Sequence, residues 1–308
     1  MRIVFMGTPE SAVPSLERLV DDGHQVAAVW TQPDKPAGRG RKLHSPPVSE
    51  IARQHGLPVY QLQKIKTAEA KDLFASHHAD VAVVVAYGKI LPPEFLAAPK
   101  HGCVNVHFSL LPKYRGAAPV NWAMVNGESQ TGVTTMRIVQ ELDAGPILLQ
   151  KAVEIVKHET APELLTRLAD LGADLLSETL GNFDRLDPKA QLDANATFAP
   201  VLKRQDGLID WTLEASSIER RVRGFQPWPN AFTNLSSQRL IIWRAEAELC
   251  EHAKMPGTIV DARSGLLTIA CGDGTVLRIS ELQAEGSRRM KTRDFLNGRE
   301  LNVGDLVG

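Results

Sequence analysis

The sequence predicts an α/β protein in which a mostly parallel sheet is followed by a small β-barrel. Residues 80–86 form the clearest strand, a continuous and largely β-branched run of the kind that parallel sheets bury on both faces. Up to about residue 180, such runs alternate with segments of helical spacing, as in β-α-β units. After residue 206 the chain instead holds short strands separated by turns, which is typical of a small barrel.

Strands and helices are expected to alternate through the first part of the chain. The opening strand, residues 2–6, leads through the turn Gly7-Thr-Pro-Glu10 into a helix that ends near residue 23. Because this turn lacks the GxGxxG fingerprint, we do not expect a dinucleotide site there. Further strands are expected at 25–31, 57–60, 102–107, 132–139 and 147–155, and helices at 48–56, 67–77 and 161–180.

The polar stretch 186–205 has little apolar periodicity and is interpreted as part of a connection between domains. We therefore expect an N-terminal domain over residues 1–189, a linker over 190–205 and a C-terminal domain over 206–308. Asp273-Gly274 predicts a hairpin in the C-terminal domain. A helix is expected there at 216–224, and strands at 231–235, 240–245, 257–261, 266–271 and 276–280.

The composition is that of an ordinary globular protein. The chain has 308 residues, of which 43% are hydrophobic and 23% are charged, with a formal net charge of -1. Such a chain is not a strongly basic nucleic-acid-binding protein, so any RNA contact must come from local clusters. The three cysteines form no CxxC pair, and we expect neither a zinc site nor a disulfide framework. Without a signal-peptide pattern or an apolar stretch of about 20 residues, a soluble cytoplasmic protein is expected.

One basic cluster interrupts the pattern after the second strand. Residues 32–47 form a loop that is too long for a plain connection. Four basic side chains stand against the single acid Asp34, which gives a local charge of +3. The four are Lys35, Arg39, Arg41 and Lys42. The loop is either a solvated surface segment or a flexible arm that contacts phosphate.

The best candidate for chemistry is the end of the strand at 102–107. Side chains alternate along a strand, so Cys103, Asn105 and His107 share one face. An amide beside an imidazole makes a donor pair suited to a developing oxyanion, and the imidazole can also move a proton near neutral pH. The alternative is an Asn and a His that are satisfied by loop carbonyls.

Parallel sheets bind their ligands at the carboxyl ends of their strands. We therefore expect the site to combine residues 86–88, residues 105–112 and the end of the strand at 132–139. Just past that last strand lies Asp143, in a turn of small residues where an aspartate is most often only a turn former.

Together these motifs resemble the folate-dependent formyltransferases. The resemblance rests on Asn105-x-His107-x-Ser109-Leu-Leu-Pro112, on Tyr-Arg-Gly-Ala-Ala-Pro at 114–119, and on Glu141-Leu-Asp143-Ala-Gly145. It covers nearly the whole chain and implies a Rossmann-like formyltransferase domain followed by an OB-like, tRNA-binding barrel. It also implies that the formyl group of 10-formyltetrahydrofolate is transferred, without a metal, to the methionine carried by initiator tRNA.

The resemblance further implies a role for each candidate residue. Asn105, His107 and Asp143 would be catalytic, with Asp143 as the partner of the histidine. The folate would lie against Ala86, Tyr87, Gly88, Ser109, Leu110, Leu111 and Pro112. The basic loop would contact tRNA, because tRNA-specific members carry such an insertion, and the protein is expected to be a monomer. Position 108 is Phe where several relatives have a smaller residue, a difference that bears on the shape of the pocket but not on Asn105, His107 and Asp143.

Other readings compete with this one. A formyltransferase acting on a nucleotide-sugar amine would keep the same three residues and can also carry a C-terminal domain. A glycinamide formyltransferase or a 10-formyltetrahydrofolate hydrolase would not need the basic loop, and a non-catalytic RNA-binding barrel would not need Asn105, His107 and Asp143. Cys103 lies roughly 13 Å from His107 along an extended strand, so it is expected in the core rather than as a nucleophile. Ser109 lacks the GxSxG elbow.

Overall fold

The computed structural model describes residues 1–308 except 38–41, 236–237, 251–252, 264 and 300. The described chain forms two compact units, each built from three segments. The first unit comprises Met1–Pro119, Gln130–Glu154 and Leu165–Ala199, and the second comprises Val120–Ser129, Ile155–Leu164 and Pro200–Gly308. The domain boundaries at 189 and 206 stay a prediction.

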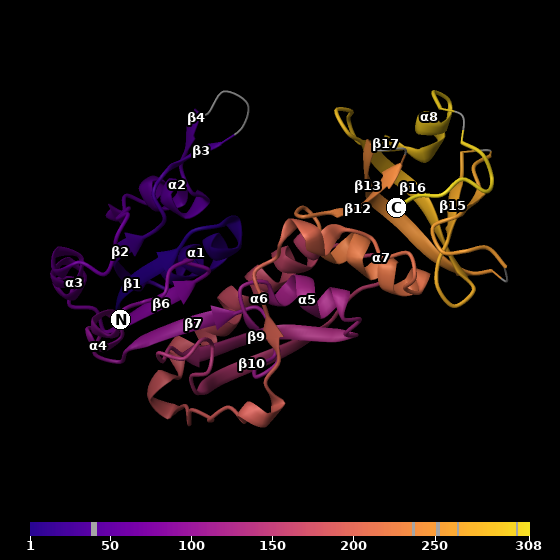
Figure 1. Cartoon of the computed structure of the whole chain (residues 1–308). Coiled ribbons are helices and arrows are strands. Elements are labelled where there is room, and N and C mark those ends of the chain that lie inside the picture. The colour runs from indigo at the N-terminus through magenta and orange to yellow at the C-terminus, as the bar shows by residue number, and fades with distance from the viewer. Residues whose placement is uncertain (38–41, 236–237, 251–252, 264, 300) are drawn as a thin grey trace. The chain divides into compact units, whose positions relative to one another are not determined.

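A seven-stranded sheet organises the first unit, in the order β10-β9-β7-β6-β1-β2-β5 (Figure 1). Five strands are parallel, and β9 and β10 are antiparallel to their neighbours, which confirms the mostly parallel sheet. The strands are β1 (Arg2–Gly7), β2 (Gln25–Trp30), β5 (Val59–Tyr60), β6 (Val81–Val85), β7 (Cys103–His107), β9 (Gln130–Arg137) and β10 (Ile147–Glu154). Short pairs β3 (Lys35–Ala37) with β4 (Lys42–His44), and β8 (Arg115–Gly116) with β11 (Phe198–Ala199), lie outside this sheet.

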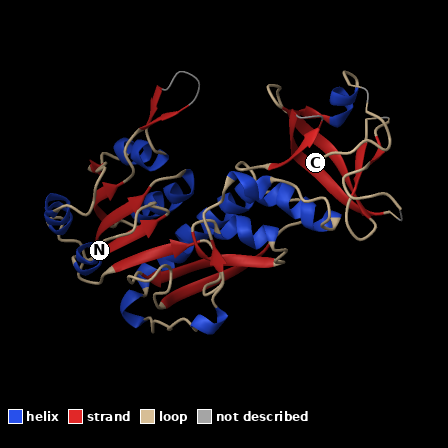
Figure 2. Cartoon of the chain, in the orientation of Figure 1, coloured by secondary structure: helices blue, strands red, loops and turns tan. Residues whose placement is uncertain are grey.

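Helices cover both faces of the sheet (Figure 2). On one face, α6 lies so close that a Cβ at Gly172 would come within 2.9 Å of the Val106 side chain. On the other face, the rings of Phe74 and Phe95 stack 3.9 Å apart in a core that includes Trp30. The helices that lie mainly in the first unit are α1 (Val13–Asp21), α2 (Pro47–Gln54), α3 (Ala68–Ala75), α4 (Pro93–Ala97) and α6 (Ala161–Gly181), with 3₁₀ turns at Glu10–Ala12, Phe183–Arg185 and Asp193–Asn195. The helix α5 (Pro119–Val125) and the 3₁₀ turn Arg204–Gly207 lie mainly in the second unit. The predicted helices at 48–56, 67–77 and 161–180 are confirmed to within two residues.

The direction of β9 differs from the expectation. His107, at the end of β7, pairs with Thr134, whereas Arg137 at the end of β9 pairs with Val104. Residues 108–129 connect the two strands and include a helix, which is long enough for the crossover of a parallel pair, so the length of the connection does not decide the direction. Because the two strands are antiparallel, the carboxyl end of β9 lies away from the end of β7, and the following residues must return along the sheet before Asp143 can reach His107.

The second unit is built on a curled antiparallel sheet in the order β12-β13-β16-β15-β14, with β17 paired to β16. The hairpin at Asp273-Gly274 is confirmed, since it joins two antiparallel strands and both residues have positive φ. The elements are α7 (Ala215–Gly224), β12 (Ala231–Leu235), β13 (Gln238–Leu249), β14 (Ile259–Asp261), β15 (Leu267–Ala270), β16 (Thr275–Ala284), β17 (Met290–Lys291) and α8 (Thr292–Leu296). In the part of the chain that the structure describes, no helix is long and apolar enough to cross a membrane.

Candidate active site

His107 is the last residue of β7, and its side chain is only 6% exposed. Its Nε2 lies 2.9 Å from the backbone oxygen of Tyr114. A carbonyl oxygen can only accept a hydrogen bond, so Nε2 carries a proton and donates it. The other ring nitrogen, Nδ1, faces the carboxylate of Asp143, with 3.7 Å between Nδ1 and Oδ2. Nδ1 is therefore the nitrogen that can gain or lose a proton here.

Asp143 lies in the turn that follows β9, with a φ of 50°. Its Oδ2 accepts a hydrogen bond of 2.8 Å from the backbone N–H of Gly116, and its side chain is 14% exposed. The turn is tight, because a Cβ at Gly145 would lie 1.8 Å from the backbone oxygen of Arg137. This turn returns the chain toward β7 and aims the carboxylate at the histidine.

Asn105 shares a face of β7 with His107, two residues away, and is half-buried. Among the residues that the structure describes, no hydrogen bond involves its side-chain amide. The expected alternative, in which loop carbonyls satisfy both residues, therefore holds for Nε2 of His107 but not for Asn105. The amide of Asn105 is available to an oxygen atom of a substrate.

Cys103 and Ser109 could each act as a nucleophile in principle, but neither is suited to attack a substrate. Cys103 is buried, its Sγ donates to the backbone oxygen of Phe95 at 3.4 Å, and burial raises its pKa to about 12. The thiolate, which is the reactive form, is therefore suppressed at neutral pH, and the expected core position is confirmed. Ser109 is buried and donates its hydroxyl to the backbone oxygen of Lys113 at 2.7 Å.

Two known protein domains match consecutive parts of the sequence. Residues 1–180 match the family described as formyl transferase, and residues 201–300 match the formyl transferase C-terminal domain. The chain belongs to the formyl transferase family. A methionyl-tRNA formyltransferase from Trichlorobacter lovleyi is 47% identical over 99% of this chain and 96% of the relative. Another, from Alkaliphilus oremlandii, is 44% identical over the full length of both chains.

Solved formyl transferases share the fold at much lower identity. The N-formyltransferase from Helicobacter canadensis, solved with folinic acid and dTDP-3-aminofucose, superimposes with a TM-score of 0.66 at 17% identity, covering 90% of this chain and 98% of the other. The sugar 3N-formyl transferase WlaRD superimposes with a TM-score of 0.67 at 18% identity, covering 94% and 99%. At this identity the likeness shows the fold alone.

The two predicted folate segments of this formyl transferase differ in their hydrogen bonding. In the segment 109–112, the backbone is largely occupied. The oxygen of Ser109 accepts from Thr134, the N–H of Leu111 bonds the same hydroxyl, and the oxygen of Leu111 accepts from Gln150. The backbone oxygen of Pro112 also accepts a hydrogen bond from the backbone N–H of Thr197. Leu110 packs against Gly132, whose added Cβ would lie 2.6 Å from it. These bonds fix the shape of the segment and leave few groups for a ligand.

The segment 86–88 is more open. It follows β6, the parallel neighbour of β7 in which Val84 pairs with Asn105. Ala86 and Gly88 are exposed and have positive φ, of 46° and 80°. Between them Tyr87 is buried, and its backbone oxygen accepts from Thr8 and Gln32. Among the described residues, no backbone–backbone hydrogen bond of Ala86 or Gly88 is found, so the backbone N–H and C=O groups of these two residues make no such bond within the protein.

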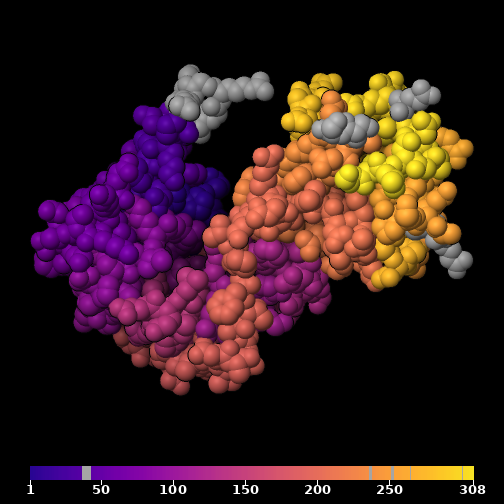
Figure 3. Space-filling model, viewed as in Figure 1, coloured from indigo at the N-terminus to yellow at the C-terminus, as the bar shows by residue number. Residues whose placement is uncertain are grey.

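The predicted tRNA-binding loop begins and ends in the hairpin of β3 and β4, which projects from the first unit (Figure 1, Figure 3). Lys35 is exposed on β3, and the backbone of Lys42 lies on β4. Arg39 and Arg41 lie outside the described residues. The base of the hairpin is fixed, because Gln61 donates to the backbone oxygen of Gln32 at 3.0 Å and to Asp34 at 2.7 Å.

Phe108 lies on the opposite face of the sheet from the catalytic candidates. It is 7% exposed and packs next to α6, since a Cβ at Gly172 would lie 3.4 Å from its ring. Because Phe108 alternates with His107, its ring fills the core under α6. The ring of Phe108 is therefore not on the face of β7 that carries Asn105 and His107, and its effect on the shape of the pocket stays a prediction.

Sequence reasoning missed Gln191, which contacts the turn that carries Asp143, and Arg115, which contacts Gln191. Gln191 donates to the backbone oxygens of Asp143 and Gly145, each at 2.8 Å. Arg115 donates to the side-chain oxygen of Gln191 from Nε at 3.0 Å and from Nη2 at 2.9 Å. The one available signal was the motif at 114–119, which contains Arg115; Gln191 lies in the stretch interpreted as a polar linker.

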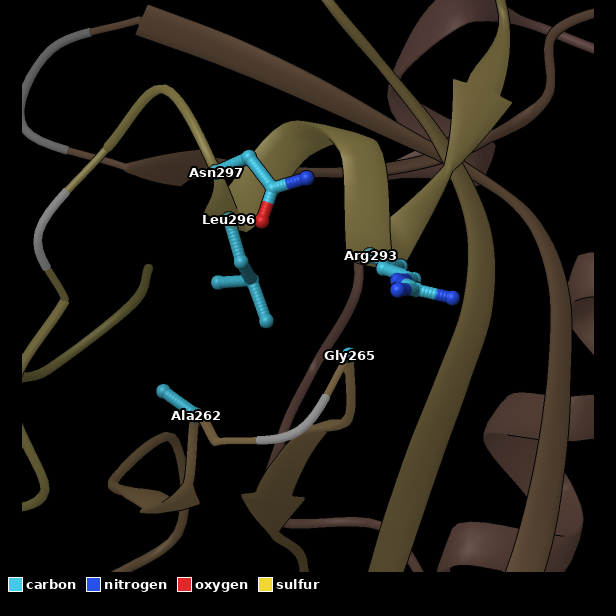
Figure 4. Close-up of a pocket in the computed structure, with 5 residues that line it drawn as sticks. All are labelled: Ala262, Gly265, Arg293, Leu296 and Asn297. Carbon is cyan, nitrogen blue, oxygen red and sulfur yellow. The ribbon is translucent and has the colours of Figure 1, made fainter.

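A separate pocket of about 550 Å³ lies in the second unit (Figure 4). It is lined by Ala262, Gly265, Arg293, Leu296 and Asn297, and so involves α8 and the turn between β14 and β15. None of the candidate residues of the first unit lines it. Over the described ranges, no group of three or more His, Cys, Asp or Glu side chains is arranged to hold a metal ion.

Proposed function

We propose that this protein transfers the formyl group of 10-formyltetrahydrofolate to the α-amino group of methionyl-initiator tRNA, and so acts in translation initiation. The observation that carries the chemistry is the pairing of His107 with Asp143 beside the unbonded amide of Asn105. The match with methionyl-tRNA formyltransferases along the entire chain supports this acceptor.

The three side chains supply what an acyl transfer to an amine requires. The amine nitrogen attacks the formyl carbon, the carbonyl oxygen becomes negative, and the bond from the formyl carbon to N10 of the folate then breaks. The N–H of Asn105 donates to the negative oxygen. Nδ1 of His107, facing Asp143, accepts the proton that the amine loses, and a proton is returned to N10. No covalent bond to the enzyme is needed, because a neutral amine is already a nucleophile.

We propose that the folate lies against Ala86, Tyr87 and Gly88, with Ser109 to Pro112 shaping the other wall. The exposed backbone groups of Ala86 and Gly88 suit the edge of a pterin, whereas the segment 109–112 is held by its own hydrogen bonds. A cytoplasmic location follows from the tRNA acceptor. We also propose that a monomer suffices, because Asn105, His107 and Asp143 all belong to one compact unit of one chain.

The acceptor is tested by incubating the protein with 10-formyltetrahydrofolate and either methionyl-initiator tRNA or a dTDP-linked amino sugar. We expect formylmethionyl-tRNA to form and the sugar to remain unmodified. Formylation of the sugar alone would favour the alternative function, a nucleotide-sugar formyltransferase. Release of formate with neither acceptor modified would indicate a hydrolase.

The basic loop is tested by replacing Arg41 and Lys42 together by Ala. We expect kcat/KM for methionyl-tRNA to fall and its salt dependence to flatten, by about one unit of slope for each lost phosphate contact. The affinity for folate should not change, because the proposed folate segments lie elsewhere in the first unit.

A matched control for this double variant removes two exposed positive charges from the other end of the sheet. Lys100 precedes β7 and Arg185 follows α6, so both lie away from the carboxyl end of β7. Replacing Lys100 and Arg185 by Ala should leave the salt slope unchanged. An identical salt slope in the Arg41/Lys42 variant and in the wild type would show that the loop is a solvated surface segment that does not contact tRNA.

A further inference from the structure

Gln191 holds the turn that carries Asp143. Its side-chain Nε2 donates two hydrogen bonds of 2.8 Å, one to the backbone oxygen of Asp143 and one to that of Gly145. A single primary amide therefore binds two carbonyl groups of the turn. This matters because Asp143 has a φ of 50°, a conformation that is costly for a residue other than glycine and persists only where its surroundings hold it.

Arg115 sets the orientation of that amide. Its Nε and Nη2 both donate to Oε1 of Gln191, at 3.0 and 2.9 Å, and Nη2 also donates to Asp193 at 2.9 Å. Arg115 is 6% exposed, so its charge is largely removed from water and is compensated by these bonds. Because the guanidinium can only donate, the oxygen of the amide must face Arg115, and the amide N–H₂ must face the turn.

The chain next to Arg115 also contacts the carboxylate of Asp143. The backbone N–H of Gly116, the residue after Arg115, donates to Oδ2 of Asp143 at 2.8 Å. The main chain of Asp143 is thus held by Gln191, its side chain is held by Gly116, and Arg115 joins the two. On the other side of Arg115, the backbone oxygen of Tyr114 accepts from His107.

We propose that Gln191, oriented by Arg115, is a positioning residue that keeps the carboxylate of Asp143 facing Nδ1 of His107. The inference rests on the proposed function, because it assigns Gln191 to the same proton-transfer step. Displacing a reacting group by about 1 Å can cost on the order of 10² in rate. Gln191 touches no reacting atom, so its whole effect on turnover should pass through Asp143.

A double-mutant cycle tests whether the effect of Gln191 on turnover passes through Asp143. We expect Gln191→Ala to lower kcat by roughly 10- to 100-fold in the wild-type background. In the Asp143→Asn background, where the carboxylate is already gone, the same change should cost less than about 3-fold. Gln191→Glu keeps the size and the contact with Arg115 but turns a carboxylate toward two carbonyl oxygens, so it should lower kcat at least as much as Gln191→Ala.

The matched control is Gln226→Ala in the second unit. Gln226 is buried where Gln191 is half-buried, and its Nε2 likewise donates to two backbone oxygens, those of Val222 and Trp243, each at 2.9 Å. Gln226→Ala should lower the melting temperature, and any change that it causes in kcat should be the same in the wild-type and the Asp143→Asn backgrounds. Thermal melts of every variant identify any that does not fold, and Gln191→Ala, which buries no new charge, decides the outcome if Gln191→Glu fails to fold.

Two results would overturn the inference. One is an equal loss of kcat on replacing Gln191 in both backgrounds. The other is a crystal structure of Gln191→Ala in which Oδ2 of Asp143 still lies 3.7 Å from Nδ1 of His107. The crystallographic test needs no activity, and the cycle can be measured with whichever acceptor the wild-type protein formylates. A failure of the tRNA proposal is therefore distinguishable from a failure of this one.

Discussion

Replacing Asp143 by Asn is expected to lower kcat for formyl transfer by at least ~10²-fold, because positioned proton transfer contributes about 10²–10⁴-fold to such reactions. The substitution nearly preserves size, and the amide oxygen can still accept from the backbone N–H of Gly116, as Oδ2 does at 2.8 Å. What disappears is the negative charge 3.7 Å from Nδ1 of His107. His107→Ala removes the proposed proton acceptor itself and is expected to cost at least as much.

Single-turnover rates with bound methionyl-tRNA separate this loss from slow product release. The control is Asp174→Asn on α6, which removes an exposed aspartate that pairs with Arg18 in the same unit. Exposed ion pairs contribute little to stability, so this variant should keep wild-type turnover and a wild-type melt. A folded Asp143→Asn protein with near wild-type turnover would show that the proton leaves by another route.

The sequence was informative where local pattern determines structure. The continuous β-branched run that became β6 and the alternation along β7 follow from periodicity, and they place Cys103 in the core and Asn105 and His107 on one face. The direction of β9 was not predictable in the same way. It depends on how the chain between residues 107 and 130 is connected, and periodicity is the same for a parallel and an antiparallel strand.

Long-range side-chain contacts explain most of what was missed. Gln191 is 48 residues from Asp143 and 76 from Arg115, and nothing in a polar stretch identifies which amide will meet a distant turn. The burial of Phe108 could not be predicted either. The sequence does not show that α6 approaches β7 closely enough at Gly172 to bury the ring of Phe108. The pairing of Asp143 with His107 came from the family resemblance, and the positive φ at Asp143 shows why a small-residue turn is needed there.

Replacing Asn105 by Ala is expected to lower kcat by about 10²–10³-fold, the usual cost of removing one donor from an oxyanion site. KM for methionyl-tRNA should change little, because the negative charge that we propose Asn105 to stabilise exists only in the transition state. The loss should not reflect unfolding. Over the described residues the amide makes no hydrogen bond, so removing it breaks none of the contacts that hold β7.

The matched control for that substitution is Asn182→Ala, which removes an exposed amide that bonds the backbone oxygen of Glu178 in the same unit. Its turnover should equal that of the wild type. Asn105→Asp sharpens the test, since it keeps the shape but puts a carboxylate where the oxyanion forms, and it should therefore be slower than Asn105→Ala. If Asn105→Ala instead raised KM at unchanged kcat, Asn105 would bind the ground state of a substrate, and His107 would remain as the donor to the oxyanion.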